Sequence, residues 1–159
     1  AAKRKAAAEG GRKAVIFTPD PALLARLSRG EISFAVVQDG AVVHECMGRG
    51  IGPALDALDR LPQLLAGAAV YDTIVGKAAA ALFILGGVRA VYAATISDSA
   101  VALLTQAGVD CRWGVRTDQI VNRTGDGLCP FEQAVLTCAE PADCLPVIRE
   151  TLARLRAAH

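Results

Sequence analysis

Aromatic side chains are scarce in this sequence. They make up 4% of the 159 residues, whereas hydrophobic residues make up 53%. We therefore expect a core built mainly of Ala, Val, Leu and Ile. Charged residues make up 21% of the chain, which together with its high hydrophobic content excludes a mostly disordered chain. The length suits one domain of about 100–200 residues. We expect residues 1–13, which are small, polar and basic, to form a disordered tail, and residues 14–159 to form a single domain.

An excess of charge of one sign is also missing, because the formal net charge is +1. General nucleic-acid binders carry a large basic excess or a basic stripe, so we expect no nucleic-acid partner. The longest apolar run, Ala78 to Val88, is shorter than the ~20 residues that span a bilayer. We therefore expect no membrane partner. No secretory signal is evident, which favours a cytoplasmic location.

Metal-binding spacings are absent as well. The chain has two histidines, His44 and the terminal His159, and no pair of cysteines in a C-x-x-C spacing. Hydrolytic zinc needs about three protein ligands and an open position. We therefore expect no metal and no cofactor. The five cysteines are most simply explained as free thiols in a reducing compartment, and they are Cys46, Cys111, Cys129, Cys138 and Cys144.

Turn and capping residues divide the chain into regular elements. Asp39-Gly40 separates two β-rich runs, 32–38 and 41–46, which predicts a hairpin with a type I′ turn. Further strands are expected at 68–71, 90–96 and 109–113. Helices are expected after Asp20, after Gly52, at 78–85, after Ser97, at 130–138 and after Glu140. A hairpin followed by alternating helices and strands predicts an α/β domain with a mixed sheet in a three-layer α-β-α arrangement.

Several local stretches carry a resemblance. They are Ser33 to Gly40, Gly48-Arg49-Gly50-Ile51 with Pro53, Asp72 with Val75 to Ala80, and Asn122-Arg123 with Cys129-Pro130 and Glu132. The order of elements resembles the cytidine-deaminase fold, and these stretches resemble DUF1893, an uncharacterised prokaryotic family with that fold. The resemblance implies a fold and a cleft, without a settled activity. Zinc deaminases carry H-x-E or C-x-E and P-C-x-x-C, and neither motif is present.

In the deaminase layout, two helix starts point at one cleft. Here they are the segments 48–53 and 72–78, which contain Arg49-Gly50 and Gly76-Lys77. Free N–H groups at a helix start suit an anion. We therefore expect binding of a small anionic or nucleotide-like molecule, with polar contacts from Asn122, Arg123 and Glu132. The alternative is that the glycines only form tight turns, that the cations lie on the surface, and that 122–127 is a solvated loop.

A second hypothesis is a metal-independent enzyme. Asp72, expected at the end of a buried strand, can act as a base, pair with Lys77 or cap a helix. Cys129, expected at a helix N-cap, can be a nucleophile or a structural thiol. Glu132, three residues on, is spaced for a capping box.

A third hypothesis is a protein-interaction domain or a homo-oligomer. It uses the hairpin edge or the amphipathic last helix, on which Leu145, Ile148, Leu152 and Leu155 share a face.

Overall fold

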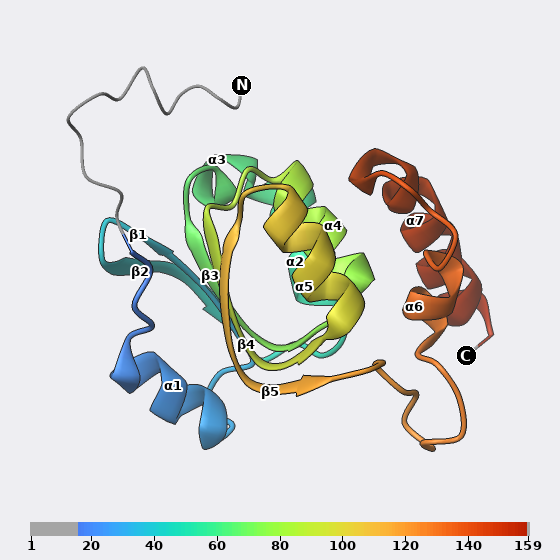
Figure 1. Cartoon of the computed structure of the whole chain (residues 1–159), viewed down its shortest axis with the longest axis horizontal. Coiled ribbons are helices and arrows are strands. Elements are labelled where there is room, and N and C mark those ends of the chain that lie inside the picture. Colours follow the sequence, from blue (N-terminus) through green and yellow to red (C-terminus); the bar gives the residue numbers. More distant parts are fainter. Residues whose placement is uncertain (1–15, 159) are drawn as a thin grey trace.

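The computed structural model describes residues 16–158, so the predicted tail 1–13 lies outside the described residues. The chain forms a five-stranded sheet surrounded by helices (Figure 1). In chain order the elements are α1 (Pro21–Ser28), β1 (Phe34–Gln38), β2 (Ala41–Cys46), α2 (Gly52–Arg60), α3 (Pro62–Leu65), β3 (Ala69–Val75), α4 (Lys77–Leu85), β4 (Ala90–Ser97), α5 (Asp98–Gln106), β5 (Asp110–Thr117), α6 (Pro130–Ala134) and α7 (Pro141–Ala157).

The sheet is mixed, as the sequence predicts, with the strand order β2-β1-β3-β4-β5. β1 runs antiparallel to both β2 and β3, whereas β3, β4 and β5 are parallel. The predicted hairpin is confirmed. Asp39 and Gly40 have φ values of 52° and 77°, which a type I′ turn requires at both central residues.

The two faces of the sheet are covered unequally. The larger core lies between the sheet and helices α2, α4 and α5, and α7 packs against α4 on the side away from the sheet (Figure 1). On the opposite face, α1 covers a smaller cluster that includes Ala35 and Tyr71. Helices therefore lie on both faces, and the helical side is two layers deep.

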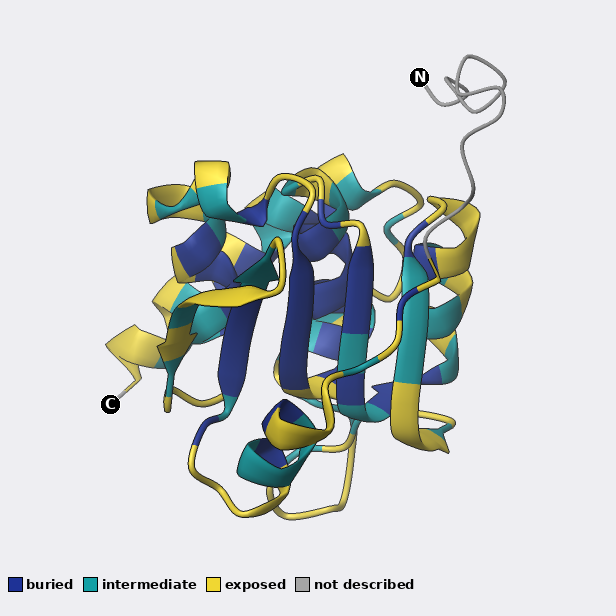
Figure 2. Cartoon of the chain, turned by 90° about the vertical axis from the view of Figure 1, so that its left-hand side faces the viewer, coloured by how far each residue is buried: buried dark blue, intermediate teal, exposed yellow. Residues whose placement is uncertain are grey.

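Helix α4 is the centre of the larger core. Its residues Ala78 to Phe83 are all buried, and the helix predicted at 78–85 is confirmed. Alanine side chains let this helix approach its neighbours closely, and one of its aromatic rings reaches the sheet. Phe83 stacks on Phe34 of β1 with a ring-centroid distance of 6.2 Å. Figure 2 shows the buried central strands and the exposed outer surfaces of the helices.

Three predicted boundaries are wrong. β3 runs through to Val75, so Asp72 lies inside the strand, opposite Phe34 and Ala93. Asp is rare in strands, but β-branched residues follow it and pair with β4. β5 continues past Trp113 because Val115 to Thr117 pair with β4. α6 stops at Ala134, well before Cys138.

No helix between residues 16 and 158 has both the length and the apolar character needed to cross a membrane.

Candidate functional site

Three helices begin at one edge of the sheet, namely the edge formed by the carboxyl ends of strands β2, β3 and β4. β2, β3 and β4 run in the same direction, because β1 lies antiparallel between β2 and β3. They therefore end at the same edge, where α2, α4 and α5 begin. In open α/β sheets, ligands bind outside the carboxyl ends of the strands. Arg49-Gly50 precedes α2, and Gly76-Lys77 opens α4, so both predicted segments follow strands that end at this edge.

The start of α4 is occupied by a carboxylate of the same chain. Glu132 accepts hydrogen bonds from the backbone N–H groups of Lys77 (2.8 Å) and Ala78 (3.0 Å). Its side chain comes from α6 and is buried, with 8% exposure. A Cβ atom on Gly76 would lie 2.5 Å from both Glu132 oxygens, so only glycine leaves room for this contact. The positive end of α4 is thus already neutralised by an internal anion.

The Lys77 side chain points toward the turn after α6. Its ammonium group donates to the backbone oxygens of Cys138 (2.7 Å) and Leu136 (3.4 Å). Lys77 and Glu132 therefore tie α4 and the α6 segment together from both sides. The predicted capping box of α6 is wrong, because Glu132 bonds to α4 and Cys129 forms no side-chain cap.

The start of α2 differs from that of α4. Its N-cap residue, Ile51, provides no side-chain cap, and Gly50 has a φ of 66°. Arg49 is exposed and forms no ion pair with another residue of the described range 16–158. The loop before it is held by Ser33, whose hydroxyl donates to the backbone oxygen of Gly48 (2.5 Å). The fold positions this helix start, and no carboxylate of the described residues bonds to its N–H groups.

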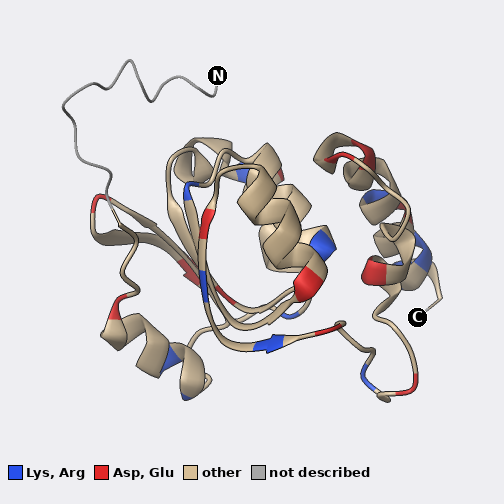
Figure 3. Cartoon of the chain, in the orientation of Figure 1, with Lys and Arg blue, Asp and Glu red and all other residues tan. Residues whose placement is uncertain are grey.

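A groove extends from this helix start between α2 and α7. It encloses about 340 Å³, and its lining includes Gly52, Leu55, Asp59, Arg149, Leu152 and Arg156. Arg149 and Asp59 bridge the two helices through paired hydrogen bonds of 2.8 and 2.7 Å. The Arg149 guanidinium lowers the pKa of Asp59. Figure 3 shows the basic residues of α7 on the outer helical layer.

Sequence reasoning missed this groove. The available signal was the spacing of Arg149, Leu152 and Arg156, which share one face of a helix. Their partner α2 lies about 90 residues away along the chain, since the Arg149–Asp59 bonds span 90 positions.

Asp72 lies on β3 inside the protein core, a few residues before the strand ends and α4 begins. Its exposure is 7%, and its Oδ1 atom accepts a hydrogen bond from the backbone N–H of Thr73 (2.8 Å). Burial raises the pKa of Asp72 to about 8. The group is therefore mainly a neutral carboxylic acid near pH 7, because desolvation disfavours its charged form.

The loop with Asn122 and Arg123 satisfies its own polar groups. Asn122 Oδ1 accepts from the Thr124 hydroxyl (3.0 Å) and from the Asp126 N–H (3.2 Å). Its amide nitrogen donates to Asp126 (3.0 Å), so Asn122 organises a local turn. Arg123 is exposed on this turn.

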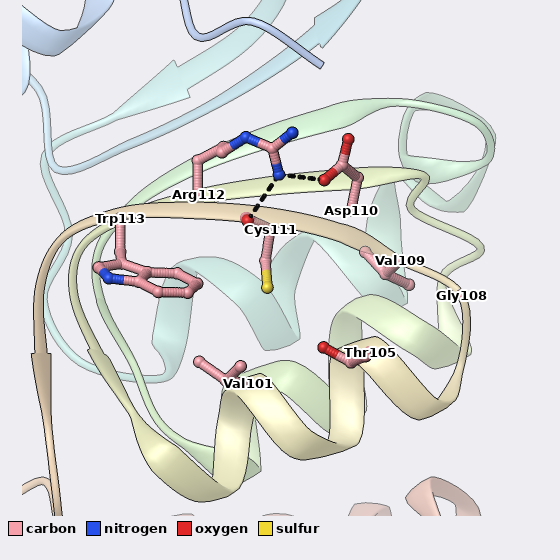
Figure 4. A pocket seen from close by; sticks show the side chains of 8 residues that line it. All are labelled: Val101, Thr105, Gly108, Val109, Asp110, Cys111, Arg112 and Trp113. Carbon is pink, nitrogen blue, oxygen red and sulfur yellow. Dashed lines mark hydrogen bonds and ion pairs between the residues drawn. The ribbon is translucent and has the colours of Figure 1, made fainter. Parts of the chain in front are cut away.

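A second hollow lies beside the outermost strand of the sheet, between β5 and α5. It encloses about 330 Å³, and Figure 4 shows Cys111 and Trp113 of β5 facing Val101 and Thr105 of α5. Burial raises the pKa of the Cys111 thiol. None of the predicted site residues lines this hollow.

Residues 16–158 contain no group of three or more His, Cys, Asp or Glu side chains placed to hold a metal ion.

Comparison with known proteins defines the family. A crystal structure of a DUF1893 family protein (TM1506) from Thermotoga maritima is similar to this chain, with a TM-score of 0.73 and 23% sequence identity. The match covers 91% of this chain and 98% of the other, and at this identity it shows a shared fold. No curated protein matches the sequence. The family model TM1506, described as a domain of unknown function (DUF1893), matches residues 23–152, and the chain therefore belongs to the DUF1893 family.

Proposed function

We propose that this protein binds a small anionic or nucleotide-like molecule at the start of α2, with Arg49 and the adjoining α2–α7 groove forming the site. The observation that supports this most strongly is a contrast between helix starts at one sheet edge. α4 is capped by Glu132 and α5 by Ser97, whereas no side chain of residues 16–158 caps α2. Unsatisfied N–H groups and the positive end of the helix dipole attract anions.

The groove adds shape and charge to this helix start. Its volume of about 340 Å³ falls within the ~300–1,000 Å³ typical of small-molecule sites. Gly52, at the start of α2, and Arg156, near the end of α7, both line it. The Arg149–Asp59 pair crosses the groove and fixes the spacing of its walls. A ligand with a phosphate or carboxylate beside a less polar part would suit this combination.

Lys77 and Glu132 have a different role in this proposal. Their polar groups bond to the protein itself, so they hold the α6 segment against α4. The ligand site is thus displaced from the predicted pair of helix starts to one of them.

We also propose that the fold is cytidine-deaminase-like. The strand order β2-β1-β3-β4-β5, the antiparallel β1 and the helix starts that share one sheet edge support this relationship. The proposed ligand site then corresponds to one of the two helix starts that flank a deaminase cleft.

A thermal-shift series with phosphate, citrate and a panel of nucleotides tests the binding proposal. We expect at least one of these anions to raise the melting temperature of the wild-type protein. Arg49→Ala should greatly reduce the shift and leave the ligand-free melting temperature unchanged, because Arg49 has no ion pair within residues 16–158. Arg29→Ala, in an exposed residue next to α1, is the matched control and should keep the full shift. Equal shifts in both variants, or no shift with any anion, would refute the proposal.

A second candidate function, acid–base catalysis, is favoured by Asp72. A buried carboxyl group whose pKa is raised to about 8 can donate a proton at neutral pH. Cys129, at the start of α6, is the candidate nucleophile of this second proposal, and the alternative is a structural thiol. Selective labelling of Cys129 by iodoacetamide near neutral pH, and its loss in Asp72→Asn, would support a coupled pair. Inert behaviour of Cys129 would remove it from the mechanism.

A further inference from the structure

Two cysteine thiols meet at the start of α7. Cys138 precedes the helix, and Cys144 lies in its first turn. The Cys138 thiol is 3.6 Å from the backbone oxygen of Asp143, and the Cys144 thiol is 3.5 Å from that of Glu140. Both sulfur atoms therefore point into the same short turn. Burial, and after it the neighbouring Cys138 thiol, raise the pKa of Cys144.

The two thiols differ in access. Cys144 has 0% exposure, whereas Cys138 is half-buried. Both are free in this structure. A small oxidant from solvent therefore reaches Cys138 first, with Cys144 placed behind it as a resolving thiol.

We propose that Cys138 and Cys144 form a reversible intrachain disulfide when the protein reacts with hydrogen peroxide or another small peroxide. The site is separate from the proposed anion site, and both thiols contact backbone oxygens of the same turn. Neither residue belongs to the ligand contacts or to the acid–base groups described above.

The reaction balances with one peroxide. The Cys138 sulfur attacks one peroxide oxygen, the O–O bond breaks, and a sulfenic acid forms while water leaves with the thiol proton. The Cys144 sulfur then attacks the sulfenic sulfur, the S–O bond breaks and the S–S bond forms. A second water carries away the Cys144 proton. The two thiols lose two electrons, and the peroxide gains them.

The surrounding groups set the rate of the second step. Burial raises the pKa of Cys144 to about 11, whereas the Lys77 ammonium acts in the opposite direction. Lys77 also donates to the Cys138 backbone oxygen and so holds this turn against α4. The disulfide would link the same turn to α7. Because the thiolate is the attacking species, disulfide formation should become faster as pH rises above neutrality.

Peptide mapping of the oxidised full chain tests this proposal. Cleavage before Asp126 and Asp143 separates a fragment 126–142, with Cys129 and Cys138, from a fragment 143–159, with Cys144. A Cys129→Ser background makes the assignment unambiguous. After treatment with about one equivalent of peroxide and blocking with N-ethylmaleimide, we expect the two fragments to be linked and to separate on reduction with dithiothreitol.

Three variants complete the test. Cys138→Ser should abolish the link, and Cys111→Ser is the matched control that should retain it. Cys144→Ala should leave a Cys138 sulfenic acid that dimedone traps, which keeps the test valid if Cys138→Ser folds poorly. The proposal is overturned if both Cys138 and Cys144 remain open to alkylation after other thiols of the chain have oxidised. It is also overturned if Cys138 proceeds to sulfinic acid without forming the link.

Discussion

Gly76 and Glu132 fit together so closely that a methyl group on Gly76 would lie 2.5 Å from each carboxylate oxygen of Glu132. These residues are far apart in the sequence, yet their contact decides which helix start carries an internal anion. It allows Glu132 to bond to the N–H groups of Lys77 and Ala78 and closes the start of α4. Of the three helix starts at this edge, the start of α2 is the one that no side chain of residues 16–158 caps, and our proposal places the external anion there.

We therefore expect Gly76→Ala to destabilise the protein, because the new Cβ atom must displace the carboxylate or the backbone. Forced overpacking costs about 1–3 kcal/mol, and a lost charge-assisted bond adds to this. Urea unfolding followed by circular dichroism measures the change. Gly52→Ala is the matched control, since nothing lies within 4 Å of its Cβ position. Equal stability of the two variants would show that Glu132 does not occupy the start of α4.

Glu132→Gln keeps the size of the side chain and removes its charge. We expect the free energy of unfolding to fall by about 1–2 kcal/mol. One of the two backbone N–H groups would face the Gln amide nitrogen, and the other would lose its charged acceptor. Hydrogen exchange at the Lys77 and Ala78 amides should become faster in this variant. Glu150→Gln, on the exposed side of α7, should change neither quantity. Unchanged exchange at Lys77 and Ala78 would argue against the cap.

Asp72 should make stability fall as pH rises. Its folded-state pKa of about 8 lies above the ordinary value of 3.8, so the folded protein holds a proton that the unfolded chain has released. The linkage slope is therefore negative between about pH 4 and pH 8. Asp72→Asn cannot ionise, so its stability relative to wild type should increase across this range. Denaturant midpoints at pH 5 and pH 8 measure this difference.

Carboxyl groups with lowered pKa values act in the opposite direction. Arg26 lowers the pKa of Glu45 and Arg149 lowers that of Asp59, and both effects contribute stability that is lost as pH falls. These groups are present in both proteins, so they cancel in the comparison. An Asp72→Asn curve parallel to that of wild type would mean that Asp72 is ionised in the folded state.

The Arg149–Asp59 pair should contribute modestly to stability. Both side chains are partly exposed, at 47% and 38%, which limits such a pair to about 0.2–1 kcal/mol. A double-mutant cycle with Arg149→Ala and Asp59→Ala should show this coupling. The Arg60–Asp56 pair, at 77% and 63% exposure, is the control and should show less. A coupling of zero for Arg149 and Asp59 would remove the bridge as a determinant of the groove.

Local signals in the sequence predicted much of the fold. Asp39-Gly40 specifies a hairpin by its backbone conformation, and Asp20 and Ser97 cap α1 and α5 with their own side chains. These effects act over a few residues. The boundaries that failed depend on partners elsewhere, as in the pairing of β5 beyond Trp113 with β4.

The candidate site was less predictable for the same reason. In the sequence, Gly76-Lys77 suggests a helix start that is open to an external anion. In the structure, Glu132, 55 positions from Lys77, occupies that helix start. Asp72 precedes polar and β-branched residues, so its position inside β3 depends on pairing with β1 and β4. The spacing of Arg149, Leu152 and Arg156 marks one face of the last helix, but the α2–α7 groove also depends on the packing of that helix on α4, which is distant in the sequence.

An NMR titration of the ¹⁵N-labelled protein with phosphate, and then with a nucleotide, tests the central claim most directly. Binding at the start of α2 should shift the backbone amide signals of Gly50, Gly52 and Ala54, while those of Lys77 and Ala78 stay in place because Glu132 occupies them. Shifts at Lys77 and Ala78 with none around Gly52 would contradict it.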